Sequence, residues 1–159
     1  MAERLMSSDH DVLDEITRQV QSEPDQDRAM AAAVATLKRR MPDYSWVGIY
    51  LLDGNELVLG PFEGTPSPHT RIPLGRGICG AAASEQATII VDDVNADPRY
   101  LACSVETKSE IVVPIMAGAD VLGEIDIDSD RHAAFGAADK TLLEAVAALL
   151  AARMSVRSR

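Results

Sequence analysis

The sequence has 159 residues, of which 47% are hydrophobic, and carries a formal net charge of −10. That length accommodates one domain with its own core and is too short for two ordinary domains. The excess of acidic residues argues against nucleic acid and anionic membranes as partners, because contacts to phosphates need clustered Lys and Arg.

The N-terminal residues, the apolar runs and the two cysteines indicate the cellular compartment of the protein. Residues 1–8 contain no apolar segment of signal-peptide length, and charges interrupt the longer apolar runs before they could cross a bilayer. We therefore expect a cytoplasmic protein. Cys79 and Cys103 are poor material for a structural disulfide in that compartment, so a bond between them would be transient or catalytic.

Two helices are predicted within residues 1–42. Ser8 and Asp9 are suitable N-cap residues before an apolar stripe at helical spacing, which ends at Pro24. Residues 25–40 resume the helical period and are rich in alanine. Both helices are expected to pack on one side of a sheet or on a second copy in a homodimer, and neither carries obvious chemistry.

From Tyr44 the hydrophobic period becomes that of a β-strand. Residues 46–52 alternate, and a tight turn at residues 53–55 leads into residues 56–60, which predicts a hairpin. Trp46 and Tyr50 are predicted on the same face of the first strand. They are either core residues or the aromatic wall of a small-molecule pocket.

The next segment alternates loops with short elements. Residues 61–69 are predicted to form a loop over the sheet that could act as a lid, and residues 70–74 a short strand. The glycine-rich residues 75–80 are predicted to start a helix. Backbone N–H groups at such a start can hold an anion, and they would stabilise the thiolate of Cys79 somewhat.

Residues 88–91 predict a strand, and residues 92–100 an acidic loop that leads to Cys103. Cys103 lies in a polar segment, and loops are where rigid scaffolds display reactive groups. Residues 109–115 and 121–128 predict two more strands joined by a turn.

The second of these strands has a strict alternation. Glu124, Asp126 and Asp128 are predicted on one of its faces, and the intervening isoleucines on the other. Several acids on one face of a central strand indicate a function. A helix is predicted from Phe135 to about residue 155, with a basic C-terminal end.

The order of these elements predicts a single α+β domain. Residues 44–129 would form a largely antiparallel sheet with the active-site loops. The N-terminal helices (1–42) and the C-terminal helix (135–155) would pack mainly on one face of that sheet.

Five motifs then carry a resemblance to a known family. They are SWVGIY at 45–50, LVLGPF at 57–62, RIPLGRGICG at 71–80, SEIVVP at 109–114 and DIDS at 126–129. In this order and spacing they resemble the free methionine-R-sulfoxide reductases, which are single GAF domains. The likeness extends from about Tyr44 to the C-terminal helix.

The resemblance implies the reduction of free L-methionine-R-sulfoxide to methionine without a cofactor or a metal. Cys103 matches the catalytic cysteine, which attacks the sulfoxide sulfur, releases methionine and is left as a sulfenic acid. Cys79 matches a cysteine that resolves the sulfenic acid into a disulfide, which a thioredoxin-type reductant then reduces.

The substrate-binding residues implied are Trp46, Tyr50, Ile78, Cys79, Glu110, Asp126 and Asp128. Glu110 and Asp128 are expected to hold the sulfoxide oxygen, because a carboxyl kept protonated by neighbouring carboxylates can donate to it. Asp126 is expected to pair the α-ammonium group, and the glycines near Cys79 to bind the substrate carboxylate.

The sequence departs from the family at position 69. Most members carry a cysteine ten residues before the one at Cys79, and His69 stands there in this chain. Cys79 is thereby left as the internal resolving thiol. The alternative function is that of a non-catalytic GAF sensor, which would bind a small molecule and act on a partner in trans.

Overall fold

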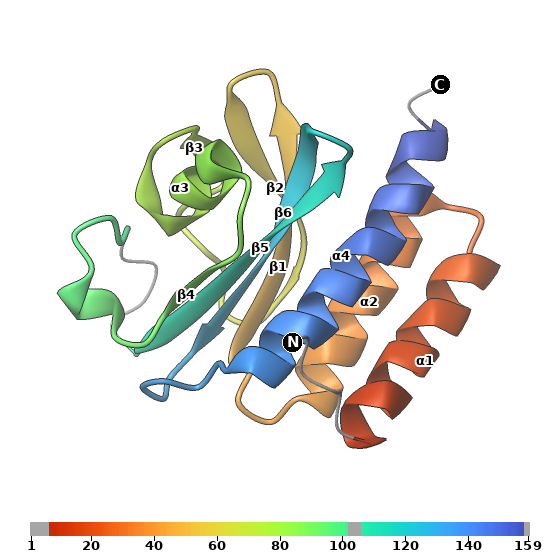
Figure 1. Cartoon of the computed structure of the whole chain (residues 1–159), viewed down its shortest axis with the longest axis horizontal. Coiled ribbons are helices and arrows are strands. Elements are labelled where there is room, and N and C mark those ends of the chain that lie inside the picture. Colours follow the sequence, from red (N-terminus) through yellow and green to blue (C-terminus); the bar gives the residue numbers. More distant parts are fainter. Residues whose placement is uncertain (1–6, 102–105, 158–159) are drawn as a thin grey trace.

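The computed structural model describes residues 7–101 and 106–157, with side chains as far as residue 154, and shows a sheet between unequal layers of helices (Figure 1). The elements are α1 (Ser7–Ser22), α2 (Gln26–Arg40), β1 (Trp46–Asp53), β2 (Glu56–Glu63), β3 (Arg71–Pro73), α3 (Gly77–Glu85), β4 (Ile89–Val91), the short 3-10 helix η1 (Val94–Ala96), β5 (Ser109–Ala117), β6 (Asp120–Ser129) and α4 (Ala137–Arg157).

The sheet has six strands in the order β3-β2-β1-β6-β5-β4, and each neighbouring pair is antiparallel. Helices α2 and α4 cover one face of the sheet, α1 packs on the outside of these two helices, and α3 lies on the other face (Figure 1). The predicted α+β domain, with a largely antiparallel sheet and helices mainly on one face, is confirmed.

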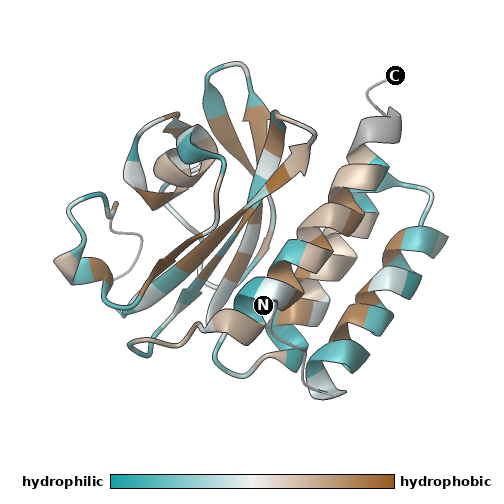
Figure 2. Cartoon of the chain, in the orientation of Figure 1, coloured by the Kyte–Doolittle hydropathy of each residue, from teal (hydrophilic) through white to brown (hydrophobic). Residues whose placement is uncertain are grey.

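Two apolar layers follow from the period-2 alternation of the strands. The layer under α1, α2 and α4 includes Val47, Ile49, Ile125 and Ile127, all nearly inaccessible to solvent. Hydrophobic residues run along the central strands, whereas hydrophilic residues interrupt the surface of α1 (Figure 2). Burial against the sheet stabilises α2 and α4, and burial against these two helices stabilises α1, because an isolated helix of about 15 residues is marginal in water.

The opposite face of the sheet carries the aromatic and acidic side chains. In the β1/β6 pairing, Tyr50 lies opposite Glu124 and Trp46 opposite Asp128. Residues paired directly across two strands project to the same side. The prediction that the acids of β6 share one face is therefore confirmed, and Trp46 and Tyr50 share that face with them.

Several element boundaries differ by a few residues from the sequence-based expectation, and two of the differences are informative. Strand β2 continues through Glu63, although residues 61–63 were expected in a loop. The register shifts between Gly48 and Tyr50 of β1, and such a bulge accommodates Pro61, which has no N–H to donate. The last helix begins at Ala137, two residues after the expected start, and Asp139 in its first turn accepts a hydrogen bond from the Gly136 backbone N–H at 3.0 Å, as in one half of a capping box.

None of the helices in the described part of the chain has the length and apolar character needed to cross a membrane.

Candidate functional site

The larger cavity on the acidic face has a volume of about 250 Å³ and an open mouth. Its lining residues are Ser45, Trp46, Thr65, Pro66, Ser67, Glu106, Thr107, Asp126, Asp128 and Asp130. Three of the predicted substrate-binding residues, Trp46, Asp126 and Asp128, meet there. We call this the substrate-sized cavity.

Trp46 is fixed as one wall of the substrate-sized cavity. Its indole Nε1–H donates to the Thr65 carbonyl oxygen at 2.9 Å, and its ring stacks on Phe62 with centroids 5.8 Å apart. The ring lies over Gly48, where an added Cβ would come within 2.3 Å of it. The glycine thus lets a large aromatic ring lie flat on the strand next to the cavity.

A second, smaller cavity of about 20 Å³ lies next to α3. It is lined by Tyr50, His69, Ile72, Gly77, Ile78, Cys79, Leu101, Glu110 and Asp126. The Tyr50 hydroxyl donates to the His69 carbonyl oxygen at 2.8 Å. The structure therefore divides the predicted site residues between two cavities, and Asp126 lines both.

Four carboxyl groups form a buried cluster between these cavities. The exposed fractions are 4% for Glu110, 0% for Glu124, 2% for Asp126 and 5% for Asp128. Burial raises the pKa of Asp126, and it raises the pKa of Glu124 and of Asp128 well above the ordinary range, with the charge of Asp126 adding to both shifts. Burial and the mutual repulsion of these groups therefore favour their protonated forms.

The carboxyl groups are also bonded to one another. Glu110 forms side-chain hydrogen bonds with Asp126 and Asp128, and both bonds partly oppose the upward pKa shifts of those two residues. A hydrogen bond between two carboxyl groups requires a proton on one of them. At least one carboxyl group of each bonded pair therefore carries a proton.

Cys79 lies in the first turn of α3 and is 5% exposed. Its pKa is raised well above the ordinary value, chiefly by burial and further by Asp126, Glu124 and Glu110. The expectation of a stabilised thiolate is wrong, because desolvation and the facing acids outweigh the favourable field of a helix N-terminus.

The glycine turn before α3 does not line the substrate-sized cavity. Gly77, Ile78 and Cys79 line the smaller one. The Gly80 N–H donates to the Arg76 carbonyl oxygen at 2.9 Å, so it is already used within the turn. The structure thus does not bring the predicted carboxylate-binding N–H groups to the wall that holds Trp46.

Cys103 lies outside the described residues, as do its neighbours in the range 102–105. The residues on either side of this range reach both cavities. Leu101 lines the smaller cavity, and Glu106 and Thr107 line the larger one.

Sequence reasoning missed several lining residues, namely Ser45, Thr65, Pro66, Ser67, Glu106, Thr107 and Asp130. A signal existed for some of them. Thr65 and Ser67 belong to the loop that was expected to lie over the sheet, and Asp130 continues the alternation of acids along β6 by one more step.

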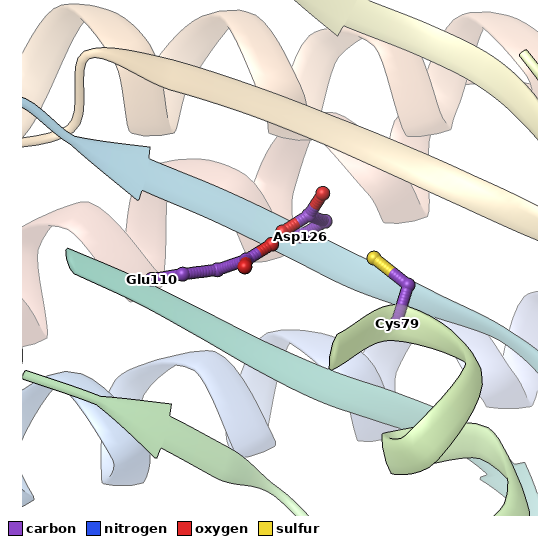
Figure 3. Close-up of side chains that lie close together, drawn as sticks. All are labelled: Cys79, Glu110 and Asp126. Carbon is purple, nitrogen blue, oxygen red and sulfur yellow. The ribbon is translucent and has the colours of Figure 1, made fainter. Parts of the chain in front are cut away.

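Three buried ligating groups approach one another at the edge of the smaller cavity (Figure 3). The Cys79 sulfur, a Glu110 carboxylate oxygen and an Asp126 carboxylate oxygen all lie within 4.8 Å of one another. They come from α3, β5 and β6, three elements that only the folded sheet brings together.

The burial of Glu124 predicts a pH-dependent change in stability. The pKa of Glu124 is raised in the folded state above its ordinary value of 4.5, so its contribution to folding is complete below that value and is lost as the pH rises toward the folded-state pKa. We expect Glu124→Gln to raise the free energy of unfolding at pH 8, with a smaller gain at pH 4. Each unit of pKa elevation corresponds to about 1.4 kcal/mol.

Urea unfolding at several pH values measures this difference. The matched control is Glu63→Gln, which changes an exposed carboxylate at the end of β2 and should leave the pH dependence as in the unmodified chain. A gain for Glu124→Gln that is independent of pH would contradict the assignment.

Comparison with known proteins adds a family to this geometry. The GAF domain family matches residues 10–154. The free methionine-R-sulfoxide reductase of Escherichia coli is 37% identical over 121 residues, 76% of this chain and 73% of that protein. The enzyme of the same name from Saccharomyces cerevisiae is 46% identical over 112 residues, 68% of this chain and 62% of that protein.

A solved structure gives the same result. The X-ray structure of the free methionine-R-sulfoxide reductase from Neisseria meningitidis in complex with its substrate has a TM-score of 0.91 and 36% identity. The match covers 99% of this chain and 96% of that one. The fold and the site thus define a GAF domain. Within that class, the chain belongs to the free methionine-R-sulfoxide reductases, a family of oxidoreductases.

Proposed function

We propose that this protein reduces free L-methionine-R-sulfoxide to methionine, with Cys103 as the nucleophile. The observation that carries the proposal is the substrate-sized cavity, which combines the Trp46 ring with the buried carboxyl groups of Asp126 and Asp128. A volume of about 250 Å³ suits a single amino acid. A sulfur or methyl group on an aromatic ring is mildly favourable, so Trp46 supports binding of the thioether end.

The buried carboxyl cluster supports activation of the sulfoxide. A sulfoxide sulfur is a poor electrophile until its oxygen accepts a proton or a strong hydrogen bond. The pKa of Asp128 is raised well above its ordinary value, chiefly by burial and further by the charge of Asp126, which favours the protonated form, and Asp128 lines the cavity. Glu110 lines the smaller cavity instead and forms a hydrogen bond with Asp128, so we assign Asp128 as the group on the oxygen and Glu110 as a positioning residue.

The reaction then balances as an oxygen transfer. The Cys103 sulfur attacks the sulfoxide sulfur, the S–O bond of the substrate breaks, and the oxygen passes to Cys103 as a sulfenic acid. Methionine leaves after gaining two electrons, and the cysteine sulfur loses two.

The acids of the substrate-sized cavity support a preference for the free amino acid. Besides Asp126 and Asp128, the exposed Glu106 and Asp130 stand at its wall. An α-ammonium group would be attracted by this set and can form charge-assisted hydrogen bonds with its carboxylates. A peptide-bound or N-blocked methionine lacks that charge.

Substrate selectivity tests the proposal. We expect turnover of free methionine-R-sulfoxide and rates lower by about 100-fold or more for the N-dabsyl R-sulfoxide, since a site built for a charged group rejects an analogue without it. A similar loss is expected for the S epimer, because its inverted sulfur directs the sulfoxide oxygen away from Asp128 when the rest of the substrate is bound in the same way. The measurement is consumption of NADPH in the presence of thioredoxin and thioredoxin reductase. Equal rates on the blocked substrate would refute the assignment of the acids, and binding without turnover would favour the sensor function.

For recycling, we propose that Cys79 attacks the Cys103 sulfenic acid and that a thioredoxin-type reductant opens the disulfide. Leu101, two residues before Cys103, packs at the start of α3, where a Cβ added to Gly77 would come within 2.9 Å of it. This contact supports a close approach, since a disulfide needs Cα atoms within about 7 Å. Because the pKa of Cys79 is raised, this step should accelerate as the pH rises above neutral.

A further inference from the structure

We propose that Cys79, Glu110 and Asp126, together with His69, form a binding site for Zn²⁺ in the smaller cavity, and that zinc bound there inhibits the reductase. The binding site stands on its own geometry. The inhibition rests on the proposed function.

The first observation that supports a zinc site is the arrangement of three buried side chains that can bind a metal. The sulfur of Cys79 points from α3 toward Asp126, and Glu110 reaches the same point from β5 (Figure 3). Their ligand atoms lie within 4.8 Å of one another. A tetrahedral zinc ion with bonds of about 2.0–2.3 Å spaces its ligand atoms by roughly 3.3–3.8 Å, so side-chain shifts of about 1 Å complete the set.

The second observation is a buried carboxylate oxygen that has no hydrogen-bond partner. Asp126 is 2% exposed, and its Oδ1 has no hydrogen-bond partner among the described residues. Asp128 Oδ1 likewise has no hydrogen-bond partner among the described residues. In residues 7–101 and 106–154, no ion pair joins Glu124, Asp126 or Asp128 to a cation. A divalent cation would satisfy the orphaned oxygen and would take the place of protons on the carboxyl groups that bind it.

The third observation is the size of the smaller cavity and the presence of His69 in its lining. A cavity of about 20 Å³ holds one water-sized species and excludes an amino acid. His69 lines it, and the His69 backbone is held by Tyr50 through its carbonyl oxygen and by Ser67 Oγ through its N–H, at 2.8 and 3.0 Å. The His69 imidazole is not among the three mutually close ligand groups, so it would supply the fourth ligand by rotating toward them from this anchored segment.

The ligand types select the metal. Thiolate and imidazole ligands suit Zn²⁺, whereas Mg²⁺ and Ca²⁺ prefer oxygen ligands throughout. One sulfur, two carboxylates and one imidazole therefore favour zinc over the abundant hard cations.

Asp126 connects this site to the substrate. It lines both cavities, so a carboxylate engaged by zinc is withdrawn from the substrate-sized cavity. The Cys79 sulfur would be engaged at the same time and could not resolve a sulfenic acid. Zinc should therefore raise the apparent KM and also stop recycling.

Zinc binding is measured by titrating ZnCl₂ into the reduced Cys103→Ser chain, in which Cys79 is the sole remaining thiol. We expect one Zn²⁺ per chain. Adding Cys79→Ser should weaken binding about 100-fold or more, and adding His69→Ala about 10-fold. Asp130→Asn is the matched control, because Asp130 lines only the larger cavity, and it should leave the affinity unchanged. Binding that survives Cys79→Ser, or that falls equally in Asp130→Asn, overturns the site.

Cobalt provides a test that does not depend on the folding of a variant. Co²⁺ added to the reduced Cys103→Ser chain should give a thiolate-to-cobalt charge-transfer band and the visible bands of a four-coordinate ion, and their absence overturns the site.

Single-turnover methionine release by the unmodified chain measures inhibition, and His69→Ala should need about 10-fold more zinc for the same effect. If the chain has no reductase activity, the titrations still decide the metal site. If zinc binds and the apparent KM for the sulfoxide stays constant, the proposal that zinc inhibits the reductase is refuted.

Discussion

Cys103→Ser should abolish the release of methionine from free methionine-R-sulfoxide, because a serine hydroxyl has neither the nucleophilicity nor the redox chemistry to accept the oxygen as a sulfenic acid. A loss of at least about 10⁴-fold in single-turnover rate is expected for removal of the nucleophile. The measurement is methionine formed per chain in the absence of any recycling reductant.

The matched variant is Cys79→Ser. It should still release about one methionine per chain in the first turnover, since Cys79 enters only after Cys103 has been oxidised. Thioredoxin-linked turnover should slow strongly or stop. Thiol counting after the first turnover separates the two steps: the unmodified chain should lose both thiols to a disulfide. Two remaining thiols would show that an external reductant acts on the sulfenic acid directly.

The second large effect is expected at the buried acids that line the substrate-sized cavity. Asp128→Asn should lower kcat/KM about 10²-fold or more, because an amide cannot transfer the proton that a carboxyl group supplies to the sulfoxide oxygen. Asp126→Asn should act mainly through KM, because we assign this residue to the substrate ammonium. Glu110→Gln should act through its hydrogen bonds to both, and we expect a similar overall loss.

A control variant distinguishes the loss of a catalytic carboxyl group from the general effect of replacing a buried carboxyl group. Asp9 is also a buried carboxyl group, with a pKa raised by desolvation and by Asp139, and it lies on α1 behind the sheet. Asp9→Asn should leave kcat/KM unchanged. Steady-state kinetics of the four variants, with folding checked by circular dichroism, provide the comparison. Unmodified kinetics in Asp128→Asn and Glu110→Gln would remove the acids from the proposed mechanism.

The division of the acids into two roles depends on the tertiary structure. Sequence reasoning gave Glu110 and Asp128 the same role, since both were matched to carboxylates around the substrate. In the folded chain, Asp128 lines the substrate-sized cavity and Glu110 lines the smaller one. We therefore expect Glu110→Asp to retain more activity than Asp128→Asn, since a shorter carboxyl group can still donate to its neighbours.

The sequence by itself determined the layers of the fold. The alternation of Glu124 with Ile125 and of Asp126 with Ile127 fixes which residues of β6 face the helices, because side chains of a strand alternate strictly between its two faces. Helical periods interrupted by Pro24 and Pro42 likewise determined the N-terminal helices, whose ends the structure places within two residues of the expected ones. The five motifs at 45–50, 57–62, 71–80, 109–114 and 126–129, in this order and spacing, identified the family.

Only the tertiary structure decided the chemical state of Cys79. In the sequence, it stands after a glycine turn at a helix start, which favours a thiolate. The folded sheet brings Glu110 and Asp126 from β5 and β6 against it and removes water, so the pKa of the thiol rises well above its ordinary value. These residues are separated by 31 and 47 positions, and local sequence patterns hold no information about the electrostatics of groups that meet only after folding.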